Sequence, residues 1–263
     1  MVSPPMLVDL AKDLFREKIR LLLVWAGAFV VWIVLVGLLW KTLAGSPDVN
    51  SLASRLAHLA GSMSSPDQDY LLVMFYATIL PLGMVVFGAQ VGSRLLTGQK
   101  ARSELSLLLA LPLPRWKILI GRLLYLAAAL LGVTVVILIS TLVMVWASEL
   151  QINGLALVAI GFRAYLLGLL FALLTVLVAN FIKKPDIAQI LTLIVFVLAY
   201  LLYLLPINST ASPVVGYLSP MFYYLGYAPL LEPWVTGHFL ILMGVNIVAM
   251  VAVWRQFDAV DLD

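Results

Sequence analysis

The chain has no cysteine and only two histidines, His58 and His238, among its 263 residues. Without thiols it can form no disulfide and offers no thiolate to a metal. A structural metal site takes about four protein ligands, and two isolated imidazoles do not make one. We therefore expect no metal and no cofactor on this chain.

Charge is also scarce, since Asp, Glu, Lys and Arg make up 11% of the residues against 63% for hydrophobic residues. The mean hydropathy is +1.09, far above that of soluble domains. Formal charge is absent from six windows: 21–40, 70–93, 123–148, 164–182, 187–231 and 233–254. Each window reaches the ~18 residues that a helix needs to cross about 30 Å of hydrocarbon. The sequence predicts a polytopic membrane protein.

The apolar runs lack the alternation of polar and apolar residues that a membrane β-barrel requires. We therefore predict an all-α bundle of six transmembrane helices in a single transmembrane domain, residues 1–263. The spans are predicted at about 21–41, 70–93, 117–147, 160–182, 187–205 and 235–254. Together with their connections they use up the chain, so no sizeable aqueous domain and no enzymatic activity are expected.

No Asp, Glu or Lys lies in the central part of a predicted span. Arg163 lies at the edge of the fourth span, where we expect it to snorkel to the membrane surface. Ion-coupled carriers usually need ionisable groups inside the membrane, and no internal repeat of the kind common in such carriers is recognisable. A secondary carrier or channel is therefore the least favoured class.

One segment superficially resembles a phosphate-binding loop. Residues 92–100 read GSRLLTGQK. The motif requires four residues between the glycines and then Gly-Lys followed by Ser or Thr, whereas here five residues intervene and the sequence continues Gly-Gln-Lys-Ala. The motif is therefore not met. Gly88 and Gly92 instead form a GxxxG pair, which permits close approach of another helix.

The sixteen basic residues lie mostly on alternate connections between the spans. Thirteen fall on one side of the predicted bundle: Lys12, Arg16, Lys18, Arg20, Arg94, Lys100, Arg102, Arg115, Lys117, Arg122, Lys183, Lys184 and Arg255. Only Lys41 and Arg55 fall opposite. Because cytoplasmic connections carry an excess of Lys and Arg, both termini are expected in the cytoplasm. The net charge of +3 thus reflects topology, and no nucleic-acid partner is expected.

The N-terminal residues 6–20 carry Leu7, Leu10 and Leu14 on one helical face and charged residues on the other. Such a pattern is typical of an amphipathic helix lying in the membrane interface. An amphipathic start to the first span explains it equally well, and both interpretations stay open.

The window 187–231 is long enough for two spans, but prolines and glycines interrupt its second half. Irregular backbone is tolerated at membrane depth only where protein or water covers it. We expect residues 206–234 to dip in from the outer side as a broken, re-entrant segment before the sixth span. Its aromatic side chains form a candidate exit gate: Tyr217, Phe222, Tyr223, Tyr224 and Tyr227. An interfacial anchoring cap is the equal alternative.

The connection between spans two and three, residues 94–122, is the most patterned part of the chain. A short Leu-rich helix is predicted to begin near Ser103, a plausible N-cap, and to end at Pro112. Leu105, Leu108 and Pro112 are expected to pack on the bundle. Arg102, Glu104 and Arg115 are expected to stay exposed to a partner.

This connection resembles the coupling loop in the membrane subunits of ABC-2 type ABC transporters. The family pattern is a polar approach, a short Leu-rich helix, Pro-x-x-Arg and a Gly-Lys pair opening the next span. The matching residues are Glu104 through Leu109, Pro112, Arg115 and Gly121-Arg122. The chain departs from the pattern in two places. Residues 99–103 replace an acidic pair and Gly-Thr, and Gly-Lys becomes Gly-Arg.

The resemblance implies a permease subunit of an ATP-driven exporter in a prokaryotic inner or plasma membrane. A coupling helix would dock on a separate cytoplasmic ABC ATPase, which would bind ATP and Mg, and a second permease, identical or related, would complete the path. The implied ATPase-coupling interface is Arg102, Ser103, Glu104, Leu105, Leu108, Pro112 and Arg115. The alternative is a non-transporting membrane scaffold that recruits a cytoplasmic protein through the same loop.

Overall fold

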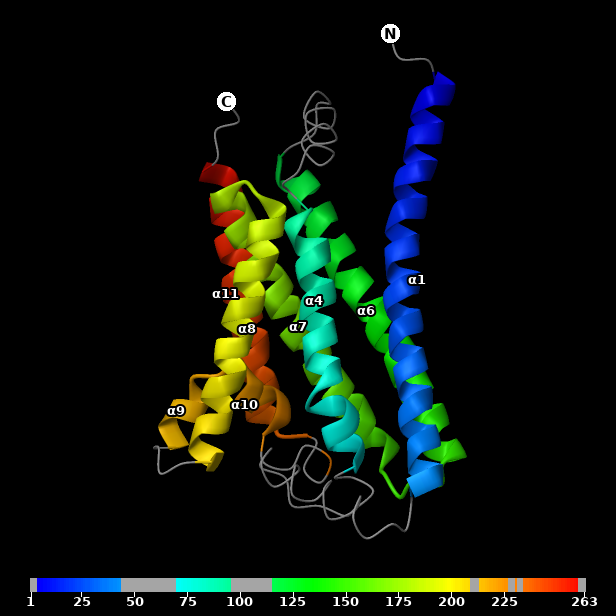
Figure 1. The fold of residues 1–263 in the computed structure, drawn as a ribbon. Helices are drawn as coiled ribbons and strands as arrows, with labels where there is room; N and C mark the ends of the chain where they lie inside the picture. The colour runs from blue at the N-terminus through cyan, green and yellow to red at the C-terminus, as the bar shows by residue number, and fades with distance from the viewer. Residues whose placement is uncertain are drawn as a thin grey trace.

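The computed structural model describes residues 4–43, 70–95, 115–208, 213–226, 230 and 234–259. All regular elements in these residues are helices (Figure 1). Six of them are long and apolar enough to cross a membrane: Ile19–Trp40, Val73–Ser93, Leu119–Ala147, Gly154–Ile182, Pro185–Leu205 and Thr236–Phe257. The predicted all-α class with six spans is confirmed.

The first helix, α1 (Pro4–Leu43), runs for 40 residues without a break. Its first turns extend beyond the rest of the bundle in Figure 1. The sequence has neither proline nor glycine from Met6 to Ala26, so nothing in it interrupts the helix. The expectation of a separate interfacial helix is therefore corrected. Residues 4–20 form a continuous start to the first span.

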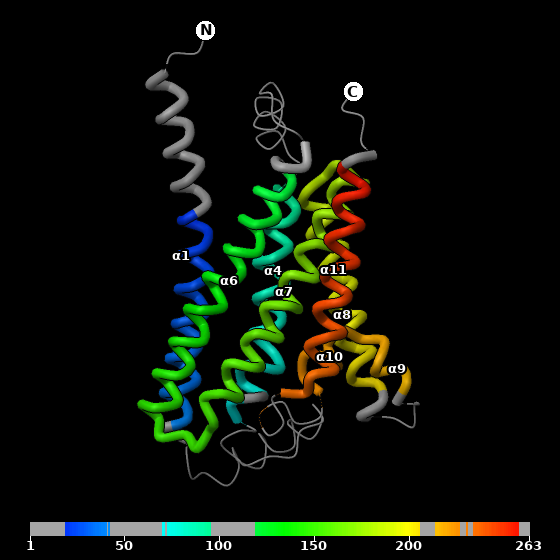
Figure 2. Tube along the Cα trace, turned by 180° about the vertical axis from the view of Figure 1, so that it is seen from behind, coloured from blue at the N-terminus to red at the C-terminus, as the bar shows by residue number. Residues whose placement is uncertain are grey.

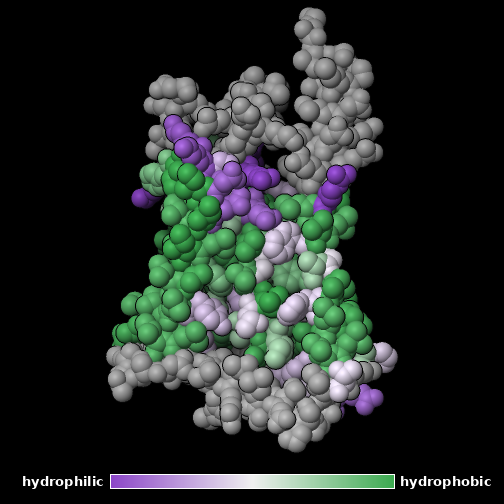
Figure 3. Space-filling view, viewed as in Figure 1, coloured by the Kyte–Doolittle hydropathy of each residue, from purple (hydrophilic) through white to green (hydrophobic). Residues whose placement is uncertain are grey.

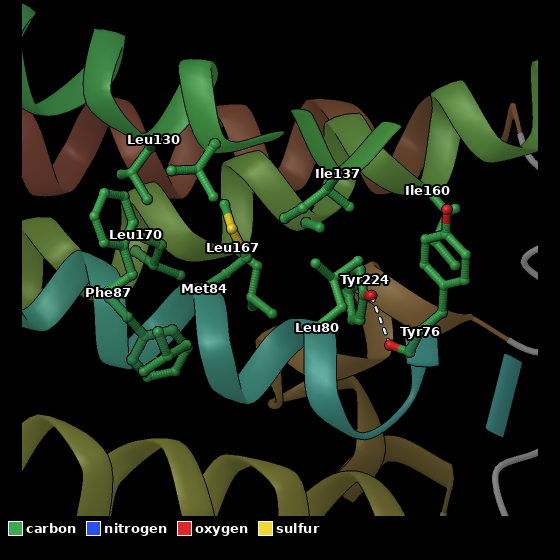
Figure 4. Close-up of a cluster of buried hydrophobic side chains, with 14 of the residues drawn as sticks. Tyr76, Leu80, Met84, Phe87, Leu130, Ile137, Ile160, Leu167, Leu170 and Tyr224 are labelled. Carbon is green, nitrogen blue, oxygen red and sulfur yellow. Dashed lines mark hydrogen bonds between the residues drawn. The ribbon is translucent and has the colours of Figure 1, made fainter. Parts of the chain in front are cut away.

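The bundle is built around span two and α7 (Gly154–Ile182), in which 61% and 56% of the most apolar stretch is buried, against 22% in the first span. Helix α7 is flanked by α4 (Ile79–Ser93), α6 (Arg115–Ala147), α8 (Pro185–Asn208) and α11 (Thr236–Ala259) (Figures 1 and 2). Leucine, methionine and phenylalanine side chains from α4, α6 and α7 fill the core between them (Figure 4).

The two ends of the bundle differ. The start of α1, the end of α4, the start of α6 and the end of α11 lie together at one end, at the top of Figure 1. Two short helices, α9 (Pro213–Tyr217) and α10 (Pro220–Leu225), lie at the other. In Figure 3 the flanks over α1 and α8 are mostly apolar, and a hydrophilic band crosses the face toward the first end. This distribution suits a helical bundle in a bilayer.

The segment before the last span is broken into short helices, as predicted. The broken segment begins after Asn208, the last residue of α8. Pro206 lies in the last turn of α8, which tolerates it because the missing N–H removes only one hydrogen bond of the helix. Ser219 caps α10, its side-chain oxygen accepting a hydrogen bond from the Met221 N–H at 3.1 Å. Within α10, Met221, Phe222, Tyr224 and Leu225 are buried. The α10 part of the segment thus packs on the bundle.

The tightest helix contact joins α4 to α7 through the GxxxG pair. A Cβ at Gly88 would lie 2.9 Å from the Gly168 carbonyl oxygen, and one at Gly92 would lie 2.5 Å from that of Ala172. Both helices therefore present small residues four positions apart, and their backbones meet directly. The predicted close approach at Gly88 and Gly92 is confirmed.

Replacing Gly92 tests this contact. Gly92→Ala is expected to lower the free energy of unfolding by about 1–3 kcal/mol, the usual effect of overpacking, because the new methyl group would overlap the Ala172 carbonyl. The matched control is Gly132→Ala in α6, where a Cβ has no neighbour within 4 Å. Chemical unfolding in mixed micelles would measure both variants, and equal effects would contradict the close contact.

Candidate functional site

The predicted coupling interface joins α4 to α6. Arg102, Ser103, Glu104, Leu105, Leu108 and Pro112 lie outside the described residues. Arg115 is the first residue of α6, and its side chain also lies outside the described part. The described ends of α4 and α6 show where this connection leaves the bundle, at the end from which α1 starts (Figure 1).

The two attachment points of this connection are fastened to the spans. The Arg122 guanidinium of α6 donates a hydrogen bond to the Leu95 carbonyl, just past the end of α4. The Gln189 amide of α8 donates to the Ser93 hydroxyl of α4 at 2.7 Å. A displacement of the connection would therefore act on α4, α6 and α8 together.

Side chains of the predicted exit gate separate into two groups. Tyr217, Phe222, Tyr223 and His238 form an outer aromatic cluster at the α9–α10–α11 end. The Phe222 ring centroid lies 4.7 Å from that of Tyr217 and 5.3 Å from that of His238. The Tyr223 hydroxyl donates to the Tyr217 carbonyl at 2.8 Å. Tyr217 is 43% exposed, so the cluster reaches the surface.

Tyr224 does not belong to this cluster. It is fully buried, and its hydroxyl donates to the Tyr76 carbonyl in span two at 2.7 Å (Figure 4). The remaining residue of the predicted gate, Tyr227, lies outside the described residues. Adjacent tyrosines in the sequence thus face different surroundings, because successive residues of a helix point about 100° apart.

Tyr224 reaches a break in span two that the sequence analysis missed. The span starts with a π-helical segment, η1 (Leu72–Tyr76), turns at Ala77 and Thr78, and continues as α4. Pro81 explains the break, because it has no N–H for the Ala77 carbonyl and its ring collides with that carbonyl in a regular helix. A proline inside a predicted span was the signal available in the sequence.

Side chains from three helices bond the carbonyls around the break. The Tyr200 hydroxyl of α8 donates to the Ala77 carbonyl at 2.9 Å. The Trp32 indole of α1 donates to the Met74 carbonyl at 3.1 Å, and the Thr78 hydroxyl donates back to Val73 at 2.9 Å. With Tyr224, these donors replace bonds that a regular helix would supply itself, as a broken span in lipid requires.

Arg163 is buried, so the prediction that it snorkels to the surface was wrong. Only 1% of its surface is exposed. It is the tenth residue of α7, which places it about 14 Å along the helix from its start. Its guanidinium carbon lies 4.9 Å from the centre of the Phe239 ring of α11, which stacks on Trp234. The guanidinium therefore lies inside the bundle, because α7 begins nine residues before Arg163 and the Phe239 ring covers the cation.

A double-mutant cycle tests the contact between Arg163 and Phe239. We expect Arg163→Met and Phe239→Leu to couple by about 1–2 kcal/mol in the free energy of unfolding, since a desolvated cation–π contact is worth about 2 kcal/mol. Chemical unfolding of both single variants and the double variant would measure the coupling. Strictly additive effects would mean that the ring does not stabilise the cation.

Residues 9–224 match the family model described as ABC-2 family transporter protein. The match covers well over half of the chain and runs from α1 into α10, including the whole connection between spans two and three. Comparison with curated proteins gives no match. With its six apolar spans, the chain therefore belongs to the ABC-2 transporter family and is a membrane permease of that family.

Proposed function

We propose that this permease exports its cargo by coupling to a separate cytoplasmic ATPase through the connection between α4 and α6. One observation carries the proposal: the two attachment points of that connection are bonded to the spans, Arg122 to Leu95 and Gln189 to Ser93. A partner docked on the connection can therefore pull on three spans. ATP and Mg would bind to the partner, and this chain would supply the path and the lever.

The distribution of basic residues supports the orientation. Thirteen of the sixteen Lys and Arg residues precede span one, follow span six, or fall between spans two and three or spans four and five. The described ends of these segments lie at the end of the bundle where α1 starts and α11 ends (Figure 1). An excess of positive charge is typical of the cytoplasmic side. Both termini would then be cytoplasmic, in a prokaryotic inner or plasma membrane, and the ATPase would dock at this end. The outer aromatic cluster would lie where cargo leaves.

Membership of the family supports the proposed partners. A second permease, identical or related, would pair with this one. In such an assembly the ATPase would be a dimer, and each ATPase subunit would act on one permease subunit. The aromatic, uncharged spans suit an amphipathic or hydrophobic cargo such as a lipid, drug or peptide. Membrane potential would have little direct action on spans whose only described interior charge is Arg163.

Charge reversal at Glu104 tests the coupling surface. Glu104→Lys is expected to reduce copurification of the ATPase at least about tenfold, because an opposing charge at a docked contact costs 1.4 kcal/mol or more. Mild detergent extraction followed by mass spectrometry would measure the ratio of ATPase to permease. Glu149→Lys is the matched control, since Glu149 is exposed in the α6–α7 turn, at the opposite end of the bundle.

The possible results separate the hypotheses. If the unmodified permease is recovered without a nucleotide-binding partner, the ATP-driven mechanism is overturned and the scaffold hypothesis gains support. If the ATPase copurifies equally with the wild type and with Glu104→Lys, the role of Glu104 is wrong while the mechanism stands.

A further inference from the structure

The break in span two divides that span between two groups of helices. Its outer part, residues 70–76, is attached to α1. The Tyr70 hydroxyl donates to the Val36 carbonyl at 2.9 Å, and the Trp32 indole donates to the Met74 carbonyl at 3.1 Å. The Tyr70 ring also packs on Trp40, with centroids 5.0 Å apart. The outer part of the span is therefore bonded to the first helix.

The inner part of the span, α4, is attached mainly to α7 and α8, and near its end also to α1, where the Trp25 indole donates to the Gln90 side-chain oxygen at 2.9 Å. Gly88 and Gly92 hold it against α7, and Ser93 accepts a hydrogen bond from Gln189 of α8. The Thr175 hydroxyl of α7 donates in turn to Thr192 of α8 at 3.0 Å. Along the chain, Ala77 and Thr78 connect α4 with the outer part, and neither belongs to a helix.

Two tyrosine hydroxyls bridge the break from the rigid side. Tyr200 projects from α8 to the Ala77 carbonyl, and Tyr224 projects from α10 to the Tyr76 carbonyl. Their helices are tied to each other, because the Ser219 hydroxyl before α10 donates to the Ala199 carbonyl of α8 at 2.5 Å. We name the Tyr200 and Tyr224 hydroxyls the tyrosine latch. They hold the outer part of span two against α8 and α10, which are bonded to each other.

The latch makes its bonds only while the outer part stays packed. Tyr76 and Ala77, whose carbonyls accept these bonds, are 1% and 2% exposed, so no water competes for these carbonyls in this arrangement. A regular helix would need no such donors, whereas Pro81 leaves a flexible joint whose carbonyls must find a partner. If the outer part swung away, water entering from the outer end could bond the same carbonyls.

We propose that the Ala77–Thr78 break is a hinge that lets residues 70–76 and the adjoining end of α1 swing away from α8 and α10 while Trp25 stays on Gln90, and that the Tyr200 and Tyr224 hydroxyls latch it closed. The two tyrosines act as positioning residues. The inference goes beyond the proposed function, because the latch is a property of the permease alone and operates with any source of energy.

The absence of cysteine from the sequence allows a direct test. Nitroxide labels on cysteines at Leu39 of α1 and Leu201 of α8, both exposed on the surface, would report the separation of the two groups by double electron–electron resonance in lipid nanodiscs. With Phe at positions 200 and 224, the Ala77 and Tyr76 carbonyls would be buried without a hydrogen-bond donor in the closed state. In the open state, water would bond both carbonyls. The double variant, Tyr200→Phe with Tyr224→Phe, should therefore favour the open state. The population of molecules with a longer distance between the two labels is expected to rise roughly tenfold.

Two further variants make the result specific. Tyr223→Phe removes a hydroxyl that bonds only within the outer cluster, to Tyr217, and should keep the wild-type distance. Pro81→Ala restores an N–H for the Ala77 carbonyl, so adding it to Tyr200→Phe should suppress the longer distance. If the double Phe variant does not fold, each single Phe variant is measured in the same way.

A distance distribution unchanged by loss of the hydroxyls would overturn the latch. A longer distance that persists with Pro81→Ala would place the motion elsewhere and overturn the hinge. The measurement uses the permease without ATPase or nucleotide, so its outcome is separate from the copurification that tests the proposed function.

Discussion

Every backbone carbonyl inside a bilayer needs a donor, and this requirement organises the structure of the permease. Most of the chain meets it with regular helices. Span two does not, because Pro81 withholds one N–H and displaces the turn before it. The donors then come from far along the chain: Trp32 of α1, Tyr200 of α8 and Tyr224 of α10. Three elements are thereby held at fixed positions around one interrupted span.

The same requirement explains why the broken segment before the last span is stable. Its short helices bury apolar side chains against α7, α8 and α11, and its polar groups bond locally. The Tyr203 hydroxyl of α8 donates to the Gly226 carbonyl at 3.3 Å, and Ser219 bonds both α8 and the start of α10. The tyrosines that were predicted to form a gate divide, among the described residues, between anchoring this segment and bonding span two.

Packing adds a second constraint, which separates a rigid centre from a more loosely held flank. Small residues bring α4 and α7 into backbone contact, and polar pairs such as Thr175 with Thr192 tie α7 to α8. The Asn180 amide of α7 similarly donates to Gln256 of α11 at 3.3 Å. The first helix contacts mainly α6, and it bonds span two at Met74 and at Gln90. A transporter of this family needs parts that move as bodies, and this division supplies them.

The sequence by itself determined the membrane class, the six helical spans and the family, because apolar length, charge placement and the glycine pair are local properties that the bilayer constrains strongly. Loop chemistry around Glu104 also pointed to the family that residues 9–224 match. The tertiary structure alone decided the rest. Arg163 is buried because Phe239, in another helix, covers it, and Tyr224 faces span two because α10 packs on the bundle. Such contacts depend on which helices pack against each other, and the pattern of residues within one span does not indicate its neighbours.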